Sequence, residues 1–262
     1  MKNYSYNHPY HLVTYSPWPL LMSLSIFITM TGSLIMFNYK NFIIFFIGLI
    51  SILLCKFQWW RDIIRESTFQ GMHTKIIITL MKTGMLMFII SEVFFFISLF
   101  WSYFHSALSP NIEIGTMWPP QNISSINPFT IPTLNTIILL TSGFTITWSH
   151  HLLLINKKKS MYPLLITIML GLFFSYIQFF EYSKMSFCMS DSIYGSLFYM
   201  MTGFHGLHVI IGSLFLLVTL MRMMMNHLTM THHFNFEASS WYWHFVDVVW
   251  IFVFSLVYWW NY

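Results

Sequence analysis

The chain has 262 residues, of which 56% are hydrophobic, 20% are aromatic and only 8% are Asp, Glu, Lys or Arg. A soluble domain carries about 25% charged residues because it hydrates its whole exterior, so this composition argues against a soluble enzyme and predicts a polytopic membrane protein. The net charge of +4 rests on only 12 basic residues that form no basic stripe, which argues against a nucleic-acid-binding protein.

Seven apolar segments follow one another along the chain, each near the roughly 20 residues that cross a bilayer as a helix. They are 17–38, 42–60, 75–104, 131–155, 161–180, 192–225 and 239–260. Continuous apolar runs, rather than short alternating ones, indicate helices. We therefore expect an all-α fold with seven transmembrane helices. In the second segment Lys56 must reach the interface for the helix to be long enough.

The short connections carry positive charge unevenly. With seven helices, the N-terminus and the connections 2–3, 4–5 and 6–7 share one side, which holds ten of the twelve cations. These ten are Lys2, Lys56, Arg61, Arg65, Lys75, Lys82, Lys157, Lys158, Lys159 and Arg222, whereas Lys40 and Lys184 fall on the other side. The positive-inside rule then places the N-terminus inside.

The inner-side segment 58–74 holds the densest charge in the chain. Arg61 and Arg65 are four residues apart, and so are Asp62 and Glu66. A guanidinium group suits phosphate oxygens because it donates two parallel hydrogen bonds, which favours a lipid headgroup site. The alternative is a solvated interfacial loop whose ion pairs contribute little stability.

Glu92 lies in an apolar segment, with no other charged residue between Lys82 and Glu113. At 1.5 Å per residue, Lys82 is about 15 Å away along a helix, which is too far for a direct ion pair. A charged group in a transmembrane helix costs about 2.5 to 3.5 kcal/mol. We therefore expect Glu92 to be protonated or bonded to a polar group of another helix, either as a proton-related group or as a neutral link between helices.

Two histidines of the sixth segment have helical spacing. His205 and His208 share a helix face, and Gly203 and Gly206 beside them predict a close helix contact with hydrogen bonds across it. The alternative for the two imidazoles is ligation of haem or a metal ion.

In the seventh segment His244 and Asp247 also share a helix face. A local bond between the two side chains is the expected arrangement. The alternative is a proton relay.

No catalytic motif occurs in the sequence, which lacks HExxH, GxSxG and a phosphate-binding glycine loop. Cys55 and Cys188 lie far apart and form no disulfide or metal-binding motif. His150-His151 and His232-His233 lie near the inner interface, where lipid phosphate or a partner chain is a more common neighbour than a metal. We therefore expect no catalytic centre and no metal site in this chain.

Several blocks of rare composition follow one another along the chain. They are 58–71, 88–95, 118–120 (Trp118-Pro-Pro), 147–151 (Thr147-Trp-Ser-His-His), 202–212 and 236–250. Together they strongly resemble the mitochondrial cytochrome c oxidase subunit III family, and the likeness extends from Ser16 to the C-terminal Tyr-Trp-Trp.

The resemblance implies a single membrane domain over 1–262. It would consist of an N-terminal helix pair at 16–60, a matrix-side loop at 61–74 and a five-helix bundle at 75–262, together enclosing a lipid-filled cleft. The chain would be a multi-pass protein of the mitochondrial inner membrane with its N-terminus on the matrix side. Its partners would be subunits I and II, which carry the haem and copper, and small accessory subunits.

The resemblance also implies a function. The oxidase transfers electrons from cytochrome c to oxygen and pumps protons, and this chain would bind phospholipid and no redox cofactor, support proton uptake and stabilise the catalytic subunit. The family's carbodiimide-reactive glutamate matches Glu92. Lipid-contacting positions match Trp60, Arg65, Glu66 and His73, and a second lipid contact matches Arg222 and His227.

Two other functions would account for the intramembrane polar residues. A stand-alone proton or solute transporter would explain Glu92 and Asp247, but no internal repeat of the kind common in transporters is visible. A membrane cytochrome would require His205 or His208 to bind haem.

Overall fold

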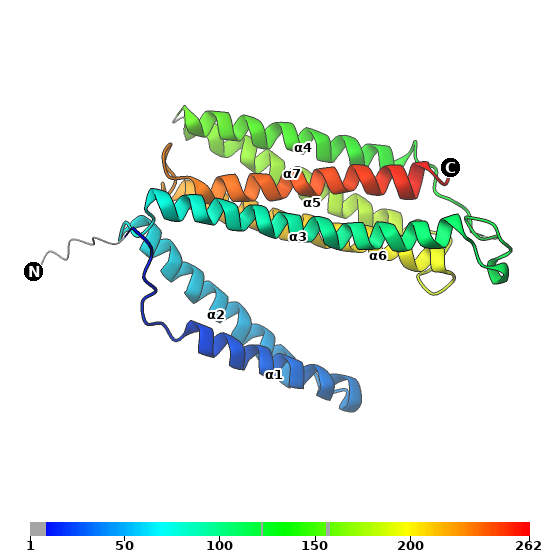
Figure 1. Cartoon of the computed structure of the whole chain (residues 1–262), viewed down its shortest axis with the longest axis horizontal. Helices are drawn as coiled ribbons and strands as arrows, with labels where there is room; N and C mark the ends of the chain where they lie inside the picture. The colour runs from blue at the N-terminus through cyan, green and yellow to red at the C-terminus, as the bar shows by residue number, and fades with distance from the viewer. Residues whose placement is uncertain (1–8, 122, 156–157) are drawn as a thin grey trace, which may run out of the picture. The chain divides into compact units, whose positions relative to one another are not determined.

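A computed structural model of the chain describes residues 9–121, 123–155 and 158–262. Lys2 and Lys157, counted above among the inner-side cations, lie outside these residues, as does the side chain of Lys158. Seven of the described helices are long and apolar enough to cross a membrane (Figure 1). The all-α prediction with seven transmembrane helices is thereby confirmed.

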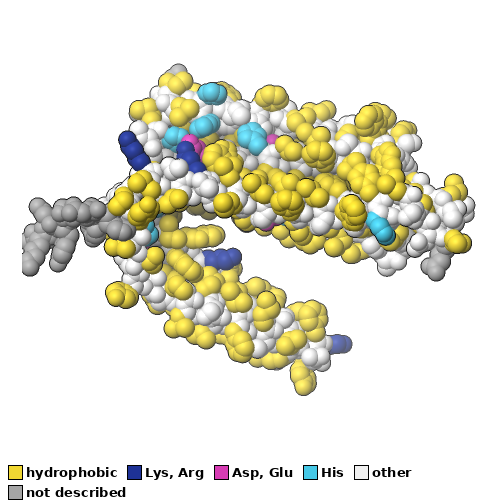
Figure 2. Space-filling view, viewed as in Figure 1, with side chains coloured by type: hydrophobic (Ala, Val, Ile, Leu, Met, Phe, Trp, Pro, Cys, Tyr) yellow, Lys and Arg dark blue, Asp and Glu magenta, His cyan; other side chains and the backbone are white. Residues whose placement is uncertain are grey.

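The helices run in chain order as α1 (Trp18–Tyr39), α2 (Ile43–Thr68), α3 (Lys75–Leu108), α4 (Ile131–Leu154), α5 (Met161–Lys184), α6 (Ile193–Met224) and α7 (Phe234–Val253). The last helix continues as a wider π-helical turn over Phe254–Trp259. Hydrophobic side chains cover much of the surface seen in Figure 2, where charged side chains are few. Such a surface suits a lipid solvent, as the composition predicted.

Helix α2 corrects the expected loop at 61–74. The helix continues to Thr68, because no proline or glycine interrupts it before Gly71 and its charged residues recur at helical spacing. Gly71 has a φ of 64°, a left-handed conformation that glycine adopts without strain and that ends the helical path. Only residues 69–74 form the connection to α3.

Helix α7 begins at Phe234, five residues before the predicted start at Ser239. The earlier start places Glu237 in the first helical turn, where an acidic group favours the helix dipole. Helices α3 and α5 likewise continue four residues past their predicted ends, to Leu108 and Lys184. The polar residues after positions 104 and 180 belong to the final helical turns, although their polarity suggests a helix end.

The chain divides into two compact units, Met1–Met81 and Lys82–Tyr262. The division falls inside α3 rather than at residue 75, the predicted start of the bundle. In the first unit α1 and α2 lie side by side as a hairpin (Figure 1). The lipid-filled cleft expected between the two parts stays a prediction.

The hairpin depends on two glycines that let the backbones approach. A Cβ at Gly32 would lie 2.6 Å from the backbone nitrogen of Phe45, and one at Gly48 would lie 2.8 Å from that of Thr29. Neither position has room for a side chain. This small-residue contact is typical of membrane helices, where close backbone packing replaces the hydrophobic effect.

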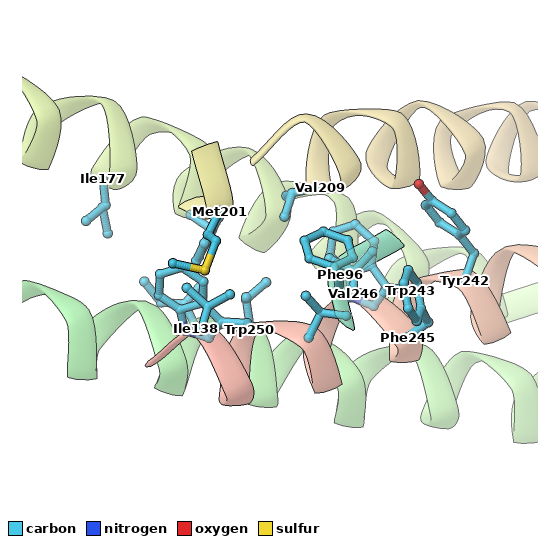
Figure 3. Packing of buried hydrophobic residues seen from close by; sticks show 14 of the residues in the cluster. Phe96, Ile138, Ile177, Met201, Val209, Tyr242, Trp243, Phe245, Val246 and Trp250 are labelled. Carbon is cyan, nitrogen blue, oxygen red and sulfur yellow. The ribbon is translucent and has the colours of Figure 1, made fainter. Parts of the chain in front are cut away.

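In the second unit α4, α5, α6 and α7 pack around one core, with α7 the most buried helix. Figure 3 shows side chains from several helices in this core, including Phe96, Ile138, Val209 and Trp250. Trp243 of α7 is fully buried, and its indole nitrogen donates a hydrogen bond of 2.8 Å to the hydroxyl of Ser142. This hydrogen bond joins α7 to α4 inside the core.

Replacing Gly48 with alanine should destabilise the hairpin. The new methyl group would collide with the backbone of Thr29, and such overpacking typically costs about 1–3 kcal/mol. Thermal unfolding of the purified protein in detergent measures the change as a lower midpoint. Gly84→Ala is the matched control, because nothing described lies within 4 Å of its Cβ position and alanine favours the helix. Equal midpoints for the two variants would contradict the close approach.

Candidate functional site

Glu92 of α3 meets His208 of α6 inside the second unit. Glu92 Oε2 lies 2.9 Å from His208 Nε2, and the two side chains are 24% and 9% exposed. His208 Nδ1 lies 2.7 Å from the carbonyl oxygen of Phe204, which can only accept, so Nδ1 carries a hydrogen. The contact with Glu92 therefore needs a further proton, held either by the carboxyl group or by Nε2. With that proton the pair is neutral as a whole.

Aromatic rings enclose the imidazole of this pair. The ring centroids of Phe95, Phe96 and Tyr242 lie 6.3, 5.1 and 6.3 Å from that of His208. Such apolar surroundings strengthen a hydrogen bond and raise the cost of an unpaired charge. The structure therefore supplies the polar partner expected on another helix, whereas the role of Glu92 in proton transfer stays a prediction.

His205 bonds a different helix from His208. It is fully buried, and its Nε2 lies 3.2 Å from the backbone oxygen of Val246 in α7. The hydrogen bonds expected across helix contacts are therefore present. The expected close contact at Gly203 and Gly206 is wrong, because no described atom lies within 4 Å of a Cβ built on either glycine. Both glycines lie on another face of α6, so the two histidines pack without them.

His244 and Asp247 face each other as predicted, within the distance of an ion pair. His244 Nδ1 and Asp247 Oδ2 are 3.9 Å apart, which is too long for a hydrogen bond. Both groups lie beside Gly143 of α4, where a Cβ would lie 2.9 Å from Asp247 Oδ2 and 3.7 Å from His244 Nδ1. Helical spacing thus brings the two side chains to one face, beside a residue that leaves room for both.

A third polar group joins α3, α4 and α7. Lys82 Nζ lies 2.6 Å from Glu237 Oε2, and His233 Nε2 lies 3.4 Å from Glu237 Oε1. His150 adds a third possible ligand, since one ligand atom from each of His150, His233 and Glu237 lies within 4.8 Å of the others. These three residues have the spacing to hold a metal ion. The sequence does not reveal this group, because its members come from distant segments, and the expected absence of a metal site stays a prediction.

In the first unit, Asp62 near the end of α2 accepts several side-chain hydrogen bonds. Asp62 Oδ2 accepts from the indole nitrogen of Trp18 at 2.7 Å, and Oδ1 accepts from Nε and Nη2 of Arg61 at 3.1 Å each. Arg65 Nη1 lies 3.7 Å from the same Oδ1, and its side chain is 56% exposed. Arg65 therefore has donors available to an outside ligand, and Trp60 on the same helix is also exposed.

Glu66 is occupied by the N-terminal segment. Its Oε1 accepts a hydrogen bond of 3.1 Å from the hydroxyl of Thr14, and its Oε2 lies 3.5 Å from Nε2 of His11. His73, the fourth predicted lipid contact of this unit, is half-buried. Of the four, Trp60 and Arg65 are the most open to a lipid headgroup.

Arg222 forms a positive group at the end of α6. The turn after the helix folds back, so that the backbone nitrogen of His227 donates to the carbonyl oxygen of Arg222 at 3.0 Å. Burial, the Arg222 guanidinium and His233 together lower the pKa of His232 below its usual range. Arg222 Nε has no hydrogen-bond partner among the described residues. An anionic oxygen would satisfy this donor.

Comparison with known proteins bears on what these sites serve. The family model described as cytochrome c oxidase subunit III matches residues 8–262. Proteins named cytochrome c oxidase subunit 3 are 52% identical in Aedes aegypti, 52% in Tachyglossus aculeatus aculeatus and 51% in Drosophila melanogaster. Each alignment covers 97% of this chain and 98% of the relative.

Replacing Lys82 with methionine should destabilise the second unit. The change leaves the half-buried carboxylate of Glu237 without its ammonium partner, which costs about 1–3 kcal/mol. Adding Glu237→Gln to Lys82→Met removes the stranded charge and should recover most of the loss. Lys40→Met at an exposed turn is the control, with an expected change within about 0.5 kcal/mol. Thermal unfolding measures all four proteins, and a double variant as unstable as Lys82→Met would rule out the pairing.

Proposed function

The chain belongs to the cytochrome c oxidase subunit III family, and from this premise we propose that it supports proton uptake by the oxidase, binds phospholipid and stabilises the catalytic subunit. As a member of the family it is a subunit of a multi-subunit membrane oxidoreductase. Membership replaces the two alternatives of a stand-alone transporter and a membrane cytochrome.

The contact between Glu92 and His208 is the observation that carries the proposal for proton uptake. The pair holds a proton between Oε2 and Nε2 at 2.9 Å, within apolar surroundings. Because the proton can lie on either group without changing the net charge of the pair, the pair can hold it inside a membrane at little electrostatic cost. Glu92 is partly exposed at the surface of α3, so a proton carrier of a partner subunit could reach it.

The proposal for lipid binding rests on two exposed or unsatisfied guanidinium groups. Arg65 and Trp60 are both exposed on the C-terminal half of α2, and indole rings and cations both suit the headgroup region of a bilayer. Arg222 offers a second donor beside His227. Glu66 and His73 would border the first of these sites.

The expected location follows from the same assignment. We place the chain in the mitochondrial inner membrane with its N-terminus on the matrix side, because ten of its twelve cations belong to that side. Subunits I and II would supply the haem and copper and would be its neighbours, together with small accessory subunits. In this arrangement the chain contributes protein surface and a proton-holding pair, and its partners carry the electrons.

Glu92→Gln tests the proton-related role. Glutamine keeps the shape and a hydrogen bond to His208 but has no acidic proton. Haem content should stay at the wild-type level, whereas the ratio of protons pumped per electron, or the number of turnovers before inactivation, should fall. Ser91→Ala is the control, because this neighbouring hydroxyl bonds only within its own helix. Complete loss of electron transfer in an assembled Glu92→Gln complex would be inconsistent with a supporting role.

Arg65→Ala tests the first lipid site. The purified complex should retain less phospholipid, because a two-point contact with phosphate is lost. Arg65→Lys keeps the charge without the paired donors and should retain an intermediate amount. Arg61→Ala serves as a matched control, since Arg61 already bonds Asp62. Quantitative lipid mass spectrometry measures the three variants, and unchanged lipid in Arg65→Ala would remove Arg65 from the site.

A further inference from the structure

A pocket of about 270 Å³ opens at the end of the second unit where α5 terminates. Its wall consists of Ser124, Ser125, Ile126, Ile131, Glu181, Lys184, Met185, Ser186 and Phe187. The hydroxyl groups of Ser124 and Ser186 lie 2.7 Å apart and join the segment before α4 to the segment after α5. The pocket is thus built from side chains far apart in the sequence, and none of its residues belongs to the sites described above.

Glu181 is the acidic group of this pocket. Its side chain is only 4% exposed, and its Oε1 accepts a hydrogen bond of 2.9 Å from the hydroxyl of Tyr258. Its other oxygen, Oε2, is buried and has no hydrogen-bond partner among the described residues. A buried carboxyl oxygen without a partner is costly, so a ligand that donates a hydrogen bond here removes the cost.

Lys184 supplies a positive charge on the same wall. Lys184 follows Glu181 by about one helical turn of α5. Its ammonium group lies 4.1 Å from the centre of the Phe180 ring. The serine hydroxyls beside it can donate to an anionic oxygen. The remaining wall is apolar and lies at the end of a helix long enough to cross the bilayer, the level at which lipid headgroups are found.

We propose that this pocket binds a phosphoethanolamine group, with the ammonium group donating to Oε2 of Glu181 and the phosphate meeting Lys184 and the serine hydroxyls. A water molecule takes about 30 Å³ of liquid, so the volume holds about nine waters, or the roughly eight non-hydrogen atoms of this group. A choline group has no N–H bond and cannot donate to Glu181. The pocket therefore selects ethanolamine over choline.

The headgroup can come from a membrane lipid or from a soluble ester, and the surface favours the lipid. Phe179 and Phe180, in the final turns of α5, are exposed apolar residues on which acyl chains can pack. Glycerophosphoethanolamine presents the same two charges without acyl chains. Comparing it with the lipid separates the two sources.

The test uses the whole oxidase complex in nanodiscs that contain equal amounts of phosphatidylethanolamine and phosphatidylcholine. Photoreactive analogues of each lipid are added in turn, and cross-linked peptides are identified by mass spectrometry. The ethanolamine probe should label segments 124–131 and 179–187 at least tenfold more than the choline probe. If soluble glycerophosphoethanolamine blocks the labelling, the two headgroup charges suffice for binding. If the labelling persists, the acyl chains of the lipid contribute to binding.

Two variants examine the charges separately. Glu181→Gln keeps an acceptor for Tyr258 and should reduce ethanolamine labelling about tenfold, since a charge-assisted hydrogen bond is lost. Lys184→Gln, at the rim and outside the core, should also reduce labelling. Lys40→Gln is the matched control and should label as the wild type does. Equal labelling by both probes, or wild-type labelling of Glu181→Gln, would overturn the proposal.

Discussion

The arrangement of this chain depends on one constraint, which is that a polar group inside a membrane bundle must find its partner on another helix. With only 8% of its residues charged, the chain has few such groups, and several of its buried polar groups fix a contact between helices. Side-chain contacts of Glu92 join α3 to α6, those of Lys82 join α3 to α7, and the hydrogen bond of Trp243 joins α7 to α4. These contacts set the rotation of helices whose apolar surfaces alone would allow many arrangements.

The same constraint shapes the surroundings of the pair formed by Glu92 and His208. The aromatic rings around His208 keep the pair with Glu92 away from bulk water, and the carbonyl oxygen of Phe204 fixes which ring nitrogen faces Glu92. The first unit follows a different plan. Its helices meet at glycines, and its charges gather at one end of α2, where Asp62 organises the donors around it. One unit thus places polar groups within a bundle, and the other places them at a helix end.

Much of the fold could be predicted because apolar length alone defines a transmembrane helix. The starts of α3, α4 and α5 agree with the predicted residues. The predicted start of α7 is five residues too late, because the sequence does not show that Glu237 pairs with Lys82. Glu92 and His208 were each identified, but their contact spans 116 positions and leaves no local pattern. The pairing of His244 with Asp247, three residues apart, does leave a local pattern, and the structure brings the two groups within 3.9 Å. Their position beside Gly143 of α4 has no such pattern in the sequence.

The hydrogen bonds of the N-terminal segment also determine when this segment can fold during synthesis. Thr14 bonds Glu66 and Trp18 bonds Asp62, while the hydroxyl of Thr74 donates to the carbonyl oxygen of Pro9. These partners are separated by 52, 44 and 65 positions, so the three contacts can form only after the ribosome has made α2 and the turn that follows it. The contacts of Pro9, Thr14 and Trp18 with the end of α2 and the turn after it therefore form only when the whole first hairpin has been made.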